Sequence, residues 1–117
     1  MLQGLRTTIY AVSDLTKATA WYTQIVGHEP YFNEPFYVGY NIGGYELGLI
    51  PDANGNATYW GTPDIDADYA RMLALGARSQ SAVKDVGEGI RVATVLDPFD
   101  NVIGLIENPH FKLDHAA

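Results

Sequence analysis

The sequence predicts an α+β fold built from two tandem β-α-β-β-β modules. The main observation is an internal repeat: residues 8–25 (TIYAVSDLTKATAWYTQI) line up with residues 58–75 (TYWGTPDIDADYARMLAL). In each copy a strand-like run reaches an aspartate, and a helical pattern then ends at a glycine. The later runs LGLI (residues 47–50) and IGLI (residues 103–106) repeat at a similar interval. A period of roughly fifty residues that occurs twice indicates paired modules and not a solenoid, which needs about three repeats.

In the first module, a strand over residues 7–12 leads to Asp14, whose carboxylate suits a helix N-cap. Apolar residues then recur at helical spacing and predict an amphipathic helix over residues 15–26, which Gly27 can end. Three short strands are expected to follow, over residues 30–32, 36–42 and 45–50. Gly43-Gly44 is a hairpin-turn signal between the last two strands.

The second module repeats this order. We expect a strand over residues 57–61, a helix capped by Asp64, and strands near residues 81–84, 90–96 and 102–107. The helix carries its larger apolar residues on one face: Ile65, Tyr69, Met72 and Leu73. The 117 residues then form one domain, with module one at about 4–51, a linker at about 52–56, module two at about 57–109 and a tail at 110–117.

Composition narrows the class of protein. A hydrophobic fraction of 47% indicates a folded globule. No run approaches the roughly 20 apolar residues of a membrane span, the N-terminus lacks a secretory signal, and cysteine is absent, so we expect a cytoplasmic protein. The net charge of −7 disfavours nucleic acid, which needs a basic face, and either favours a cationic ligand or serves solubility alone.

The segments VSDL and WYTQIVG, then DIDADYARMLALGA, then DPFDNVIGLIE, in this order and spacing, resemble the vicinal oxygen chelate superfamily. This superfamily includes glyoxalase I, extradiol dioxygenases, and the fosfomycin and bleomycin resistance proteins. The resemblance covers about residues 4–109 and implies two curved mixed sheets that form a cleft. The family usually has glycine where Asp100 stands, and aspartate tolerates the left-handed turn conformation better than most residues.

The metal-dependent members of the superfamily take two ligands from each module, one in the first strand and one in the last. The resemblance places these positions at Thr7, Gly48, Ala57 and Gly104. None of these side chains is an imidazole or a carboxylate, so we expect no metal and no other cofactor. We also expect the two glycines to leave extra room in the cleft for a larger ligand.

Strand alternation places Glu46 on the same face as Gly48, and Tyr59 and Ile9 on the faces of Ala57 and Thr7. Glu46 then either contacts a ligand or lies solvated at a hairpin end, and Tyr59 either stacks on a planar ligand or packs in the core. We name no catalytic residue. The predicted ligand-binding residues are Thr7, Ile9, Glu46, Gly48, Tyr59 and Gly104.

Other conspicuous side chains have simpler expectations. Trp60 should pack under a helix, and Trp21, which lies off the apolar stripe of its helix, should pack on a second subunit. Half of the aromatic cluster of residues 31–40 should be core, and the rest could wall a pocket or a dimer interface. We expect the Arg91 side chain to be exposed to solvent. None of the three histidines stands at a position that the resemblance assigns to a metal ligand.

Three functions fit these residues. The first is a metal-free protein that binds a small aromatic or cationic molecule in an acidic, aromatic-lined cleft, on the model of bleomycin sequestration. The second is a lyase, isomerase or dioxygenase relative that uses displaced metal ligands such as Glu46, or acid–base chemistry without metal. The third is an accessory domain with a vestigial cleft. In each case we expect a homodimer, since small proteins of this type complete their cleft by pairing.

Overall fold

The computed structural model describes residues 2–51 and 56–111, which hold eight strands and two helices. These residues fall into two compact units. The N-terminal unit contains residues 7–51 and 56, and the C-terminal unit contains residues 2–6 and 57–111. Residues 52–55 of the expected linker and residues 112–117 of the expected tail lie outside the described residues.

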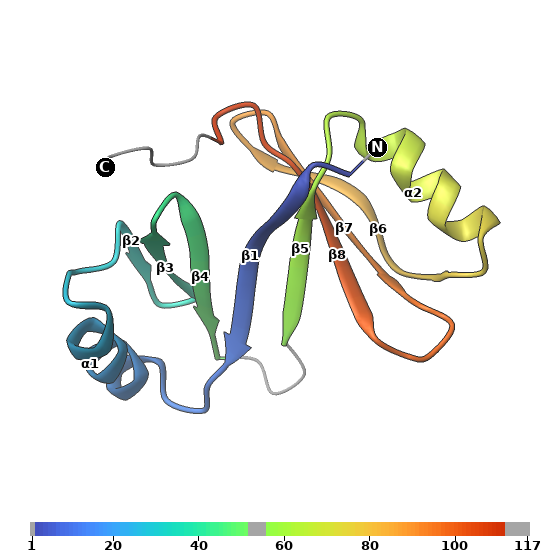
Figure 1. The fold of residues 1–117 in the computed structure, drawn as a ribbon. Coiled ribbons are helices and arrows are strands. Elements are labelled where there is room, and N and C mark those ends of the chain that lie inside the picture. Colours follow the sequence, from blue (N-terminus) through green and yellow to red (C-terminus); the bar gives the residue numbers. More distant parts are fainter. Residues whose placement is uncertain (1, 52–55, 112–117) are drawn as a thin grey trace. The chain divides into compact units, whose positions relative to one another are not determined.

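The N-terminal unit has the expected β-α-β-β-β order. Its elements are β1 (Gly4–Ala11), α1 (Leu15–Val26), β2 (Phe32–Glu34), β3 (Tyr37–Ile42) and β4 (Tyr45–Ile50). The strand order is β2-β3-β4-β1, in which β1 runs parallel to β4 and the other neighbours are antiparallel (Figure 1). Gly43 and Gly44 both have positive φ, so a two-residue turn joins β3 to β4. This turn sets Gly39 directly opposite Gly48.

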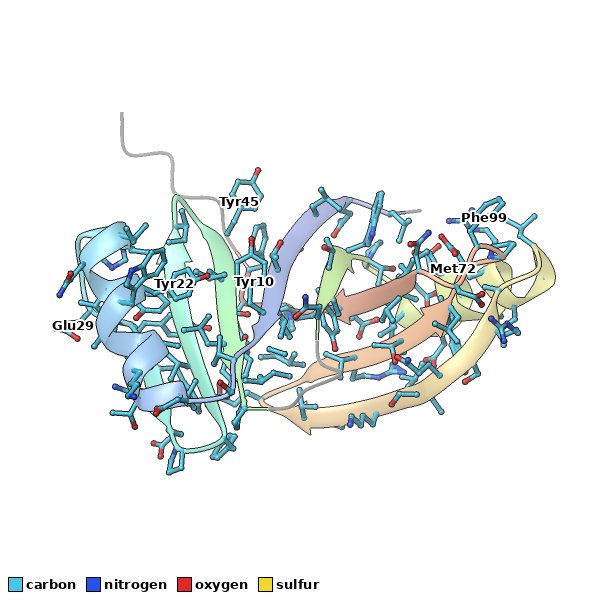
Figure 2. All side chains as sticks on the ribbon, turned by 90° about the horizontal axis from the view of Figure 1, so that it is seen from below. Tyr10, Tyr22, Glu29, Tyr45, Met72 and Phe99 are labelled. Carbon is cyan, nitrogen blue, oxygen red and sulfur yellow. The ribbon has the colours of Figure 1, made fainter. Side chains whose placement is uncertain are left out.

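Helix α1 covers one face of this sheet and begins and ends as the sequence predicts. The Asp14 carboxylate accepts a hydrogen bond from the backbone of Lys17, and Gly27 ends the helix in the left-handed conformation at φ 90°. Beneath the helix, the buried core consists of Val38, Tyr40 and Leu49. Figure 2 shows Tyr22 of α1 directed toward Tyr10 of β1, with ring centroids 6.2 Å apart.

The C-terminal unit repeats the order with a second core. Its elements are β5 (Ala57–Gly61), α2 (Ile65–Ala74), β6 (Arg78–Gly87), β7 (Ile90–Leu96) and β8 (Val102–Glu107), and the strand order is β5-β8-β7-β6. Ile65, Ala93 and Leu105 are the buried core, with Trp60 packed against it as expected. Leu73 corrects the prediction for α2, because its side chain is 39% exposed and does not join this core.

Several strand bounds differ from the predicted ones. The strand expected at residues 30–32 begins instead at Phe32, since Pro30 has no backbone N–H to donate to a ladder. Strand β6 is longer than expected and contains register shifts. Asp100 has φ 69°, so it takes the left-handed conformation expected at the position of the family glycine. Neither helix in the described part of the chain is long and apolar enough to cross a membrane.

Strand β1 is divided between the two units, which the sequence repeat does not predict. Residues 7–11 pair with β4, whereas the residues before them belong to the C-terminal unit. There Leu2 packs against the core, and the backbone of Gln3 donates a hydrogen bond to the carbonyl of Gly61 at 2.8 Å. The Arg6 guanidinium lies over the ring of Phe111, 3.6 Å from its centroid.

Candidate functional site

The candidate site lies on the helix-free face of the N-terminal unit, the sheet face opposite α1. In the register between β1 and β4, Thr7 is opposite Glu46 and Ile9 is opposite Gly48. Because side chains alternate along a strand, these four residues share one face. Four of the six predicted ligand-binding residues therefore lie together in one unit.

Glu46 is held on this face by two hydroxyl groups. Its Oε1 accepts a hydrogen bond from Thr7 Oγ1 at 3.0 Å, and its Oε2 accepts one from the hydroxyl of Tyr31. Thr7 is buried and Glu46 is half-buried. Desolvation, together with the hydrogen bond and the charge of Glu46, raises the pKa of Tyr31. The Tyr31 hydroxyl therefore keeps its proton at neutral pH and remains a donor.

Aromatic rings lie on the same sheet face as Glu46. Tyr31 lies over Gly39, where a Cβ would come within 3.1 Å of Tyr31 Cε1. Tyr37 lies over Gly48, where a Cβ would come within 2.8 Å of Tyr37 Cζ. The ring of Phe32 meets that of Tyr37 edge to face at a centroid distance of 6.0 Å. We call this arrangement the glycine floor: two directly paired glycines covered by tyrosine rings.

The glycine floor corrects one expectation. The absence of side chains at Gly48 and Gly104 was expected to enlarge a cleft, but a tyrosine fills the space in both units. Tyr37 occupies the space over Gly48, and Tyr59 occupies the space over Gly104. Because glycine has no side chain, an aromatic ring can lie directly on the strand at each position. These two glycines therefore make room for the packing of a tyrosine ring.

The N-terminal unit has an excess of negatively charged side chains. Its described residues include four carboxylates, at Asp14, Glu29, Glu34 and Glu46, and one basic side chain, Lys17. Within the described residues, the ion pairs lie in the C-terminal unit. The hydroxyl groups of Thr7 and Tyr31 that donate hydrogen bonds to Glu46 are neutral, so they do not neutralise the charge of its carboxylate.

A separate pocket in this unit, about 450 Å³ in volume, lies on the other side of the sheet. Its lining comes from α1 and the segment from Glu29 to Glu34, and includes none of the predicted ligand-binding residues. Its open, solvent-exposed walls make it a weaker candidate than the face around Glu46.

In the C-terminal unit, the two remaining predicted residues lie together. Tyr59 is opposite Gly104 in the parallel pairing of β5 with β8, and its ring covers that glycine, with a Cβ position 2.5 Å from Tyr59 Cγ. Burial raises the pKa of the Tyr59 hydroxyl. Arg91 is more than a solvated arginine, because it forms ion pairs with Asp66 of α2 and with Glu107.

Neither a protein-family model nor a curated protein matches the sequence. Solved structures do match. A variant of methylmalonyl-CoA epimerase from Streptomyces coelicolor is 20% identical, with a TM-score of 0.73 over 96% of this chain and 99% of that chain. A glyoxalase/bleomycin resistance protein/dioxygenase superfamily member from Vibrio splendidus 12B01 is 16% identical, with a TM-score of 0.68 over 92% and 98% of the two chains.

The Mn(II)-bound glyoxalase from Novosphingobium aromaticivorans is 19% identical, with a TM-score of 0.73 over 91% of this chain and 39% of that chain. The chain has the vicinal oxygen chelate fold. At these identities the likeness shows the fold and not an activity, since one fold hosts many functions.

The residues at the four positions that the family resemblance assigns to metal ligands do not suit a metal. The Thr7 hydroxyl already donates to Glu46, and tyrosines cover Gly48 and Gly104. Ala57 has no donor atom. In residues 2–51 and 56–111, no group of three or more histidine or acidic side chains is placed to hold an ion. We therefore assign no step of any chemistry to a metal, and its absence from the protein stays a prediction.

Sequence reasoning missed the roles of Tyr31 and Gly39. Tyr31 was expected inside a strand over residues 30–32, but β2 begins at Phe32, and the contact of its hydroxyl with Glu46 was not predicted. Gly39 had a usable signal, because a two-residue turn at Gly43-Gly44 pairs residues whose numbers sum to 87 and so sets Gly39 against Gly48.

Proposed function

We propose that this chain is a metal-free small-molecule-binding protein, and that its ligand is a planar aromatic cation bound at the helix-free face of the N-terminal unit. The observation that carries the proposal is Glu46, a charged carboxylate held by Thr7 and Tyr31 beside aromatic rings. A cation bound beside Glu46 could donate hydrogen bonds to the carboxylate and also lie against the aromatic rings. The roles of Tyr59 and Gly104 as ligand contacts stay predictions.

The energies are compatible with a useful affinity only if several terms combine. A cation over an aromatic face contributes roughly 0.5–2 kcal/mol. Binding at micromolar concentration needs about 8 kcal/mol. Burial of the apolar part of the ligand against Ile9 and Phe32 must therefore supply most of the rest, at about 25 cal/mol per Å². This requirement favours a ligand with a broad aromatic surface.

Sequestration is the first candidate role, by analogy with the bleomycin resistance proteins. The second is an isomerase or lyase reaction in which Glu46 is the general base. The position of Glu46, fixed by two donors, favours this candidate too, and structural neighbours described as epimerase and glyoxalase share the fold. Turnover of a bound compound that is lost in Glu46→Gln would establish the second role.

The test is a thermal-shift screen followed by titration calorimetry. Benzamidine, benzamide and benzoate form a matched cationic, neutral and anionic series, and proflavine adds a larger planar cation. We expect the cations to raise Tm, since a ligand that binds the native state stabilises it. Glu46→Gln should weaken the binding of proflavine about tenfold, which corresponds to about 1.4 kcal/mol.

Glu88→Gln is the matched control, because it removes one negative charge from an exposed turn of the other unit. A preference for benzoate, or equal losses in both variants, would show that the acid excess serves solubility alone. Elemental analysis of the same samples should find no stoichiometric divalent metal. One tightly held metal per chain would favour the enzyme candidate instead.

We extend the proposal to a cytoplasmic homodimer. Trp21 supports it, since this side chain is 56% exposed and aromatic residues are enriched in interface cores. Light scattering at micromolar concentration should give twice the mass of the chain, and a monomer would contradict this part of the proposal.

A further inference from the structure

The two donors that hold Glu46 differ in how firmly they are fixed. Thr7 is 6% exposed and lies in β1, in register with Glu46. Tyr31 is 65% exposed and precedes the three-residue strand β2, whose residues are all exposed. The backbone of Tyr31 is tied to the carbonyl of Gly39 at 3.0 Å, but its side chain lies at the surface. The Thr7 bond is therefore built into the sheet, whereas the Tyr31 bond can open by side-chain rotation alone.

Opening of the Tyr31 bond would expose a flat surface beside Glu46. The ring end of Tyr31 lies against Gly39, and a Cβ at position 39 would be 2.8 Å from Glu46 Oε2. Gly39 is buried and pairs with Gly48, so the strand beneath Tyr31 carries no side chain there. Rotation of one ring would uncover both the glycine floor at Gly39 and one oxygen of the carboxylate.

We propose that Tyr31 is a specificity-determining lid, and that a planar cation with N–H donors binds by displacing its hydroxyl from Glu46. The inference rests on the proposed function. The Tyr31 hydroxyl is a neutral donor, and hydrogen bonds between two charged groups are stronger. A cationic N–H group can therefore replace it at Glu46, whereas a neutral ligand gains too little to do so. Thr7 remains bonded throughout and keeps the carboxylate in place.

The raised pKa of Tyr31 supports this competition. Because partial desolvation of the hydroxyl and the charge of Glu46 both favour the protonated phenol, the hydroxyl stays a donor across the neutral range.

The test compares proflavine binding, followed by fluorescence, in the wild type and in Tyr31→Phe. The variant keeps the ring and removes the donor, so the ligand no longer has to break an internal hydrogen bond. We expect Tyr31→Phe to bind proflavine about tenfold more tightly, the ratio expected from one hydrogen bond to a charged group. Tyr10→Phe is the matched control, since it removes a phenol from the helix-covered face of the same sheet, and its affinity should equal that of the wild type.

Weaker or unchanged binding in Tyr31→Phe, together with a loss in Glu46→Gln, would overturn the lid and leave the proposed function standing. Binding that does not depend on Glu46 would overturn both. A second measurement does not depend on the stability of the variant. In ¹³C-tyrosine-labelled wild type, the Cζ signal of Tyr31 should move toward the position of a solvated phenol when proflavine is added. A Tyr31 signal that stays at its ligand-free position in saturated protein would contradict displacement.

Discussion

Glu46 in the N-terminal unit and Asp68 in the C-terminal unit are both carboxylates that accept a hydrogen bond from a threonine hydroxyl. They differ in what else surrounds them. Asp68 is 3% exposed and also accepts from Arg71, so its charge is paired. Glu46 is half-buried and takes its second bond from the neutral Tyr31. The same threonine–carboxylate pair therefore belongs to a partly buried ion pair in the C-terminal unit, whereas in the N-terminal unit both hydroxyl groups that donate to the carboxylate are neutral.

The tyrosine packing over the two covered glycines, Gly104 and Gly48, also differs between the units. At Gly104 an added Cβ would meet the base of the Tyr59 ring, 2.5 Å from Cγ, so the whole ring would have to leave its place by rotation about χ1. At Gly48 it would meet the hydroxyl end of Tyr37, which is the far end of a flexible side chain. The C-terminal unit is thus packed rigidly over its glycine, and the N-terminal unit is packed adjustably.

The largest expected effect tests this difference in packing. Gly104→Ala should lower the free energy of unfolding by roughly 2–3 kcal/mol, the upper part of the range for overpacking, and Gly48→Ala by less than about 1 kcal/mol. Urea unfolding of the two variants measures both values. Equal losses would show that the two tyrosines are equally fixed and would break the comparison.

The next effect compares the carboxylates. Asp68→Asn should cost about 1 kcal/mol, because the buried pairing with Thr62 and Arg71 loses its charge, while Glu46→Gln should cost less than about 0.5 kcal/mol. Burial opposes ionisation of Asp68, but the hydrogen bonds from Thr62 and Arg71 outweigh it and lower the pKa of Asp68. A lowered pKa stabilises the fold above the unfolded value of about 3.9, and this contribution is lost as the pH falls below it.

The wild type should therefore lose more stability than Asp68→Asn between pH 5 and pH 2 (both roughly, from the ordinary carboxyl range). Thermal melts across this interval measure the difference. Equal acid sensitivity of the wild type and Asp68→Asn would show that the charge of Asp68 does not stabilise the fold.

The smallest effect concerns Tyr31. Its pKa is raised, so it stabilises the fold fully below the ordinary tyrosine value of about 10, and this contribution is lost as the pH rises above that value. The wild type should consequently lose slightly more stability than Tyr31→Phe in alkaline buffer. Denaturant unfolding of both proteins at increasing alkaline pH measures this difference. If the free energy of unfolding falls equally in the wild type and in Tyr31→Phe, the hydrogen bond from Tyr31 to Glu46 does not stabilise the fold.

The sequence predicted the elements better than the site. Both aspartate caps and the bounds of α1, β4, β5, β7 and β8 agree with the structure, since cap residues, β-branched runs and glycine turns are local signals. Alternation also gave the shared face of Glu46 and Gly48. It did not reveal the covering tyrosines, because the space over a glycine depends on the rotamers of residues in other strands. Tyr31 was predicted in a strand over residues 30–32 and in an aromatic cluster that could wall a pocket. Its contact with Glu46 was not predicted, since its hydroxyl group and not a strand positions its side chain.

The division of β1 has a consequence for the order of folding. Leu2, Gln3 and Arg6 complete a unit whose other residues begin at position 57 and extend to Phe111. During synthesis Leu2, Gln3 and Arg6 leave the ribosome well before residues 57–111, which contain their packing partners. Closing so long a loop costs entropy and slows folding. The N-terminal unit can therefore form before residues 57–111 have been synthesised, whereas the C-terminal unit must wait for these residues.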